Sequence, residues 1–259
     1  MSIEGSGASR AGGEGIHNED AFLVEEDLGL YVVCDGASAS EAGEVAARVA
    51  RDAVAASVEQ SRRELDVRLG RVARFVVEKA MRAALRAVAS RQAEDPEVAG
   101  LATTITMLLA HRHLGVIGHR GDSRAYLIRR GRRRLLTKDD ELTEVVARGQ
   151  SESADFDVFS LELEPRDTLV LCTDGAEFVV EGPTIPRIAD ELSPSALASR
   201  IVSLASRTDP SSDATAVVVR VRGEPMPGWL ELSEIPRRTA FGHTYVREST
   251  PPGRRQENE

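Results

Sequence analysis

A buried β-strand is predicted at Leu30-Tyr31-Val32-Val33-Cys34-Asp35-Gly36. The run is short, apolar and rich in β-branched residues, and its Asp-Gly pair marks the turn at which the strand stops. The same pattern recurs at Thr168-Leu169-Val170-Leu171-Cys172-Thr173-Asp174-Gly175. Each segment therefore delivers one carboxylate to the end of a strand, next to a glycine that lets other backbone approach closely. For a single copy of the pattern, an ordinary Asp-Gly turn is the simpler explanation.

Two more carboxylates, Glu19 and Asp20, stand directly before a predicted strand over residues 21–25. A turn separates this strand from residues 30–34, so the two are expected to pair as an antiparallel hairpin. In an antiparallel pair the start of one strand lies beside the end of its partner. The pairing alone therefore predicts that Glu19 and Asp20 meet Asp35.

A further acidic residue, Asp213, precedes the last apolar strand, residues 214–221. Carboxylates gathered at the ends of hydrophobic strands repel one another unless a cation neutralises them. Oxygen ligands without clustered histidine or cysteine suit Mg²⁺ or Mn²⁺. Two such ions would lower the pKa of a shared water and neutralise the charge of a phosphate. The segment His111-Arg112-His113 has no third ligand nearby and is interpreted as an ordinary turn.

The net charge of -9 argues against a general nucleic-acid binder. Both cysteines lie in the two apolar strands, which indicates a reducing compartment and no disulfide scaffold. Residues 1–15 lack the apolar segment of a signal peptide, and the longest apolar run, residues 101–110, is too short to span a bilayer. We expect a soluble, cytoplasmic protein without a nucleic-acid or membrane partner. The basic run over residues 129–134 is interpreted as a solvated hairpin tip, with a docking site for an acidic or phosphorylated partner as the alternative.

One folded domain, residues 16–222, is predicted between a flexible N-terminal arm, residues 1–15, and a disordered tail, residues 223–259. The arm is rich in glycine and serine, and the tail in proline, glycine and charge. Apolar residues at helical spacing predict helices at residues 41–60, 65–92, 141–148, 185–192 and 195–207. Strands joined by hairpins imply antiparallel sheets with helices on their outer faces. The expected fold is therefore α+β, a two-sheet sandwich covered by helices.

Seven motifs in a fixed order carry a resemblance to a known family. They are Asn18-Glu19-Asp20, Val33-Cys34-Asp35-Gly36 with Gly43-Glu44-Val45-Ala46, Ala102-Thr103-Thr104, Gly121-Asp122-Ser123-Arg124, Leu136-Thr137-Lys138-Asp139, Leu171-Cys172-Thr173-Asp174-Gly175 and Ser212-Asp213-Ala214-Thr215. As a set they resemble the metal-dependent Ser/Thr protein phosphatases of type 2C in their bacterial form. The resemblance covers residues 18–221. It implies an α-β-β-α sandwich of two antiparallel sheets flanked by helices, with a centre of two Mn²⁺ or Mg²⁺ ions and room for a third.

The resemblance also implies a set of metal-site residues: Glu19, Asp20, Asp35, Gly36, Asp122, Asp174 and Asp213. Asp35 would bridge the two ions, and Asp35 and Asp174 would act in catalysis through metal-bound water. Glu19 would hold waters on one ion, and Asp122 would sit near the third. Thr103 and Thr104 match a structural motif without a catalytic role.

Four departures from the family pattern concern the handling of substrate. Gly15 stands where the family has an arginine that grips the substrate phosphate, and Arg10 is the nearest candidate to replace it. Ala39-Ser40 occupies the place of a segment with a histidine, and Ala214 stands where an asparagine is usual. The stretch between residues 149 and 158 is shorter than the family's substrate-side flap.

The function implied is hydrolysis of phosphoserine or phosphothreonine in a phosphorylated protein, opposing a Ser/Thr kinase, with that kinase or its target as partner. An alternative is a weak or inactive phosphatase-like module that binds a phosphoprotein. A third interpretation is a nucleotide or small-molecule phosphohydrolase. The gathered carboxylates favour an enzyme, whereas the missing arginine and the short flap favour a binder.

Overall fold

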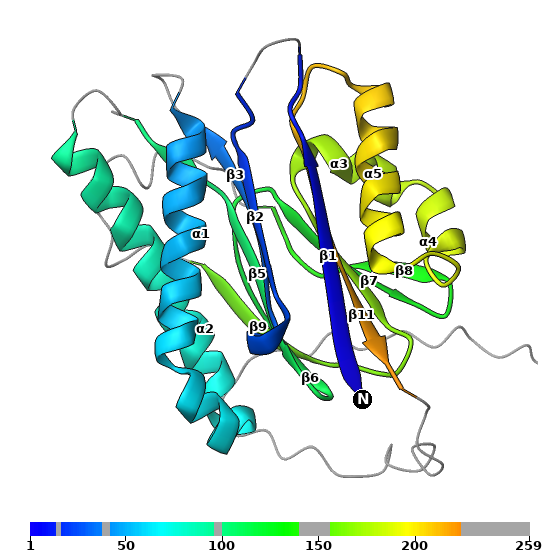
Figure 1. Cartoon of the computed structure of the whole chain (residues 1–259), viewed down its shortest axis with the longest axis horizontal. Coiled ribbons are helices and arrows are strands. Elements are labelled where there is room, and N and C mark those ends of the chain that lie inside the picture. Colours follow the sequence, from blue (N-terminus) through cyan, green and yellow to red (C-terminus); the bar gives the residue numbers. More distant parts are fainter. Residues whose placement is uncertain (14–16, 38–41, 96–99, 140–155, 224–259) are drawn as a thin grey trace, which may run out of the picture. The chain divides into compact units, whose positions relative to one another are not determined.

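Two antiparallel sheets stacked face to face form the centre of the protein (Figure 1). This computed structural model describes residues 1–13, 17–37, 42–95, 100–139 and 156–223, without the side chains of residues 66–71. The first sheet has the order β1 (Ser2–Arg10), β11 (Ala214–Arg222), β10 (Thr168–Cys172), β7 (Arg124–Arg129), β8 (Arg132–Leu135). The second has the order β2 (Asp20–Glu25), β3 (Leu30–Ala37), β5 (Ile105–His111), β6 (Leu114–Arg120), β9 (Asp157–Glu162), and β4 (Ala102–Thr103) also pairs with β3.

Helices cover the outer face of each sheet (Figure 1). The second sheet is covered by α1 (Gly43–Gln60) and α2 (Arg62–Glu94), and a short 3₁₀ helix, η1 (Glu26–Leu28), joins β2 to β3. The first sheet is covered by α3 (Asp174–Glu181), α4 (Thr184–Ile188) and α5 (Pro194–Thr208). The predicted α+β sandwich with helices on its outer faces is confirmed.

The core forms three apolar layers, which explains why β3 is apolar on both faces. Leu30, Val32 and Cys34 pack under α1 and α2, whereas Tyr31 and Val33 face the other sheet. Alternation with period two sends successive side chains to opposite faces of a strand. Because both faces of β3 are covered, the strand is a continuous hydrophobic run that ends at its first carboxylate, Asp35.

The predicted flexible arm is wrong for residues 2–10, which form β1 and pair with β11 from Ser2 opposite Arg222 to Arg10 opposite Ala214. The glycines of this strand make space for the other sheet. A side chain at Gly5 would collide with the ring of Tyr31, and one at Gly7 with the ring of Phe22. Aromatic side chains thus fill the space above a strand whose own residues have little β-propensity.

The basic run over residues 129–134 lies at a hairpin tip, as predicted, because β7 and β8 pair around the turn at Arg130-Gly131 and residues 130–134 are exposed. Arg129 ends β7 and forms ion pairs at 2.7 Å with Asp167, which is fully buried, and with Glu164. Residues 132–134 form the exposed start of the edge strand β8. Arg129 is thus the member of the run with a structural role, because it ties the end of β7 to Glu164 and Asp167.

The structure also bears on the predictions for the cysteines and the remaining helices. Both cysteines are buried free thiols, as expected. Within the described residues, no helix has the length and apolar character needed to cross a membrane. The helix α3 was not predicted, because Asp174-Gly175 was interpreted as a turn. Outside the described residues lie the predicted helix over residues 141–148, most of the flap stretch, Gly15, residues 38–41 and all of the tail beyond Gly223.

Candidate metal centre

The hairpin of β2 and β3 brings the first two carboxylates together. Asp20 lies directly opposite Asp35 in the register of the two strands. The amide of Gly36 donates to the carbonyl oxygen of Glu19 at 3.1 Å. The proximity that strand pairing predicted for Glu19, Asp20 and Asp35 is confirmed.

The backbone of Asp35 is held by two threonines, Thr103 at the end of β4 and Thr104 directly after it. Its amide donates to Thr104 Oγ1 at 2.9 Å, and its carbonyl accepts from the Thr103 hydroxyl and the Thr104 amide, both at 2.9 Å. Thr104 Oγ1 lies 2.6 Å from Ser123 Oγ, next to Asp122. The two threonines therefore fix the position of Asp35.

Asp174 approaches Asp35 from the first sheet, where it opens α3 directly after β10. The two carboxyl groups lie within hydrogen-bonding reach of each other. Burial raises the pKa of Asp35 to about 9, and the charges of Asp20, Asp174 and Asp122 add to the rise. The carboxylates of both sheets thus converge at Asp35, and their repulsion opposes its ionisation.

Asp20 lies deeper in the same group. Thr173 donates its hydroxyl to Asp20 Oδ2 at 2.8 Å, whereas Asp20 Oδ1 is buried and has no hydrogen-bond partner among the described residues. Burial raises the pKa of Asp20 to about 7, hydrogen bonds from Thr215 and Thr173 lower it in part, and the charges of Asp213 and Asp174 raise it. A buried carboxylate oxygen without a donor is the expected state of an atom that faces a cation or its water.

Asp213, just before β11, holds the N-terminal segment against the site. Its Oδ1 accepts from the amide of Gly12 at 2.7 Å and its Oδ2 from the amide of Glu19 at 2.6 Å. A carboxylate oxygen has two lone pairs, so each oxygen retains one for a further ligand. Asp213 therefore belongs to the group, but it also has a structural role that the sequence did not reveal.

The lack of a side chain at Gly43 leaves space for the carboxylate of Glu19. A Cβ at Gly43 would lie 2.6 Å from Glu19 Oε2 and 2.7 Å from the carbonyl oxygen of Gly36. The carboxylate of Glu19 and the carbonyl of Gly36 thus border the same small space, which any other side chain at position 43 would fill. Both are hard oxygen donors.

Asp122 follows the turn at Gly121, whose φ of 101° requires glycine. Burial raises the pKa of Asp122, and the charges of Asp174 and Asp139 raise it further, whereas His119 lowers it. The predicted third-ion residue is therefore at the border of the acidic group.

The residues fit a divalent-ion centre by donor chemistry and by shape. Within the part of the chain that the structure describes, no three carboxylate, imidazole or thiolate groups already stand in coordinating geometry. The group nevertheless supplies only oxygen donors, it contains the unpartnered Asp20 Oδ1, and it encloses the space beside Gly43. These features match Mn²⁺ or Mg²⁺, which neutralise clustered carboxylates.

Arg10 lies at the correct end of the first sheet for the role predicted for it. It is exposed at the end of β1, opposite Ala214 and thus one residue from Asp213. Arg124, by contrast, is engaged, because it forms ion pairs with Asp139, Glu177 and Glu181 at 2.6–3.1 Å. Arg10 remains the predicted contact for a substrate phosphate.

Thr173 is the site residue that the sequence interpretation missed. Its hydroxyl donates to Asp20 and accepts from the amide of Thr215 at 3.1 Å, so it joins the two sheets below the carboxylates. The sequence could have indicated this role, because Thr173 directly precedes the Asp174-Gly175 pair. A hydroxyl next to a carboxylate of the site lies close enough to hydrogen-bond to the other carboxylates.

The comparisons with known proteins agree with this geometry. The sequence profile of the family described as "Protein phosphatase 2C" matches residues 7–219, and the chain belongs to this family. The serine/threonine protein phosphatase PstP of Mycobacterium tuberculosis is 30% identical in an alignment 234 residues long, which covers 79% of this chain and 42% of PstP. The chain thus spans less than half the length of that relative.

Two solved structures show the same fold. The crystal structure of the M. tuberculosis phosphatase PstP/Ppp has a TM-score of 0.74 and 25% identity, and the match covers 86% of this chain and 100% of that one. The PstP catalytic domain in complex with two manganese ions has a TM-score of 0.72 and 26% identity, with 85% and 99% covered.

Proposed function

We propose that this protein is a metal-dependent phosphatase that hydrolyses phosphoserine and phosphothreonine in proteins. The supporting observation is that carboxylates from separate elements, Asp20 of β2, Asp35 of β3 and Asp174 of α3, converge between the two sheets. Folding gains nothing from placing like charges together at partly buried positions, so the arrangement is explained by a cation.

The ions would be held by the carboxylate of Asp35, the carbonyl of Gly36, and the carboxylates of Asp174, Asp213 and Glu19. That the related PstP domain binds two manganese ions supports this assignment. When bound, two divalent ions supply a water of lowered pKa and neutralise the charge of a phosphate. Asp122 would border a third ion.

The residues around this centre position its ligands. Thr103 and Thr104 fix the backbone on either side of the Asp35 carboxylate. The Thr173 hydroxyl orients Asp20 so that Oδ1 remains an acceptor that faces the centre, where it can hold a water by hydrogen bonding. Hydrogen-bonded partners of ligands commonly set both affinity and geometry at such sites.

Arg10 would bind the substrate phosphate, since Gly15 stands at the position where the family has an arginine for this purpose. A guanidinium binds a phosphate through charge-assisted hydrogen bonds. The substrate would be a phosphorylated protein, and a Ser/Thr kinase or its target would be the partner whose modification is reversed. The intact carboxylate group disfavours a module that only binds phosphoproteins, because binding a phosphate does not require clustered negative charge.

The test is Mn²⁺-dependent hydrolysis of p-nitrophenyl phosphate and of a phosphothreonine peptide, with a nucleotide as a third substrate. Asp35→Asn and Asp174→Asn should each lower the rate by about 10²–10³-fold, since each removes one ligand charge. Asp52→Asn, on an exposed residue of α1, is the matched control and should keep full activity. Activity on the nucleotide alone would reject a protein phosphatase, and metal binding without hydrolysis would favour the phosphoprotein-binding module.

A further inference from the structure

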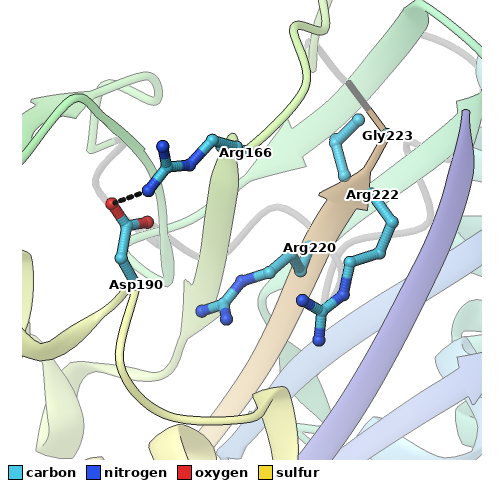
Figure 2. A pocket seen from close by; sticks show the side chains of 6 residues that line it. Arg166, Asp190, Arg220, Arg222 and Gly223 are labelled. Carbon is cyan, nitrogen blue, oxygen red and sulfur yellow. Dashed lines mark ion pairs between the residues drawn. The ribbon is translucent and has the colours of Figure 1, made fainter. Parts of the chain in front are cut away.

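A second charged site lies at the opposite end of β11 from the carboxylates. Figure 2 shows a pocket there, which has a volume of about 220 Å³. Its lining residues are Arg166, Asp190, Arg220, Val221, Arg222 and Gly223. From Ala214 to Arg222 the strand advances eight residues, or ~26 Å at ~3.3 Å per residue. A ligand in this pocket would not contact the metal centre.

Arg220 is the buried base of the pocket. It is 5% exposed, and its guanidinium donates to the Leu192 carbonyl at 2.7 Å, to Thr168 Oγ1 at 3.2 Å and to the Ala189 carbonyl. Among the described residues no carboxylate forms an ion pair with it, and two of its five N–H groups remain for another acceptor. Burial and the charge of Arg222 lower the pKa of Arg220, whereas the charges of Asp190 and Glu4 raise it. The guanidinium therefore has carboxylates nearby but hydrogen-bonds only to uncharged oxygens.

Two exposed arginines complete the pocket. Arg222 lies two residues further along β11, on the same face as Arg220, and pairs with Glu4 at 2.6 Å. Arg166 reaches across to Asp190 at 3.6 Å (Figure 2). The side chains of Arg166 and Arg222 are 75% and 51% exposed. Ion pairs at such exposure contribute little, so an incoming anion of higher charge can displace these carboxylates.

The turn that carries Arg166 is fixed. Arg166 has a φ of 74°, which is uncommon for a residue with a side chain, and its amide donates to the Val221 carbonyl at 2.9 Å. The next residue, Asp167, is buried and accepts two hydrogen bonds from Arg129 at 2.7 Å. The backbone that positions Arg166 beside β11 is therefore preorganised.

We propose that this pocket binds a phosphoryl group, either free phosphate or a phosphorylated side chain, at a site separate from the metal centre. Three guanidinium groups against the single carboxylate of Asp190 give the lining a net charge of about +2, in a chain of net charge -9. Guanidinium groups match the oxygens of a phosphate through paired N–H donors, which is why arginine is used for phosphate recognition.

The test is calorimetric titration of the full-length protein in EDTA, at constant ionic strength, with sodium phosphate, a phosphothreonine peptide or its unphosphorylated form. We expect one site, with affinity at least tenfold weaker in the double variant Arg166→Gln/Arg222→Gln. The charge-matched control Arg132→Gln/Arg134→Gln, on the exposed edge strand β8, should stay within twofold. Asp190→Asn should bind at least threefold more tightly, because the competing carboxylate is lost.

Equal affinities in the two arginine double variants, or no binding by the unaltered protein, would overturn the proposal. Tighter binding of the phosphopeptide than of free phosphate would identify a phosphorylated protein as the source, and the reverse order would identify free phosphate. Because EDTA removes the metal, the measurement needs no hydrolysis. A protein without phosphatase activity would still give a clear result.

Discussion

The two ends of β11 carry opposite charges, and the two sets of charged side chains differ in how far their neighbours compensate them. At the Asp213 end, carboxylates from both sheets face one another, and burial together with their mutual repulsion raises the pKa values of Asp20 and Asp35. At the Arg222 end, the buried Arg220 is held by backbone carbonyl oxygens and the outer arginines by exposed carboxylates. The acidic end requires a small ion of high charge, whereas the basic end is stable as it stands and keeps donors for an anion.

The largest expected effect is a dependence of stability on pH in the metal-free protein, caused by the carboxylates at the acidic end. The folded protein holds protons on Asp35 up to about pH 9 and on Asp20 up to about pH 7, whereas the unfolded chain releases them near pH 4. Stability should therefore be highest below pH 4 in respect of these groups and fall by several kcal/mol as pH rises to 9.

Thermal unfolding in EDTA at pH 5, 7 and 9 measures this loss. Mn²⁺ should restore stability at pH 7 and above, and Asp35→Asn should flatten the pH dependence in EDTA because the most strongly shifted group is removed. A metal-free protein equally stable at pH 5 and pH 9 would contradict the raised pKa values that burial and repulsion give Asp35 and Asp20.

The second effect concerns the support of the basic end. Asp167→Asn should lower the free energy of unfolding by about 2–3 kcal/mol, because Asp167 is buried and its charge holds Arg129 in place. Asp190→Asn is the control, since its pair with Arg166 is exposed, and it should change stability by less than about 0.5 kcal/mol. Urea unfolding at pH 7 compares the two variants. An equal decrease in the free energy of unfolding would mean that the buried ion pair of Asp167 contributes no more to stability than the exposed pair of Asp190.

A smaller effect is expected at the base of the acidic end. Thr173→Val removes the hydroxyl that donates to Asp20 Oδ2, so Mn²⁺ should bind about tenfold more weakly. Titration calorimetry with Mn²⁺ gives this value. Thr208→Val, at the exposed end of α5, should leave the affinity unchanged. Unaltered affinity in Thr173→Val would show that orientation of Asp20 has no influence on the ions.

The smallest effect is expected at Arg10. Arg10→Gln should raise KM for a phosphothreonine peptide by about five- to tenfold and leave kcat nearly constant, since it removes one charge-assisted contact to the substrate. Steady-state kinetics in Mn²⁺ give both constants, with Arg132→Gln as the control for net charge. A KM identical to that of the control would exclude Arg10 from phosphate binding.

Local pattern was sufficient where neighbours in the chain are also neighbours in space. The hairpin placed Asp20 opposite Asp35 because a short turn leaves little choice of partner. The position of Asp213 among the acidic residues was also anticipated, since it precedes an apolar strand. Its hydrogen bonds to the amides of Gly12 and Glu19 were not, because those partners come from a segment far away in the sequence.

The strand β1 shows the opposite case. Glycine and serine dominate residues 2–10, so local propensity predicts a flexible segment. The segment becomes a strand because β11 offers its edge and because the rings of Tyr31 and Phe22 fill the space above Gly5 and Gly7. Neither cause is visible in the nine residues themselves.

The pairing of β1 with β11 also determines when the acidic end can assemble during synthesis. Ser2 lies opposite Arg222, so β1 cannot pair until β11, more than 200 residues further along the chain, has been synthesised. Contacts between such distant residues form late and slow the folding reaction. Since Asp213 ties Gly12 and Glu19 into the acidic end, a nascent chain that lacks β11 has not assembled this group of carboxylates. The candidate metal centre therefore forms only after residues 2–222 have been synthesised.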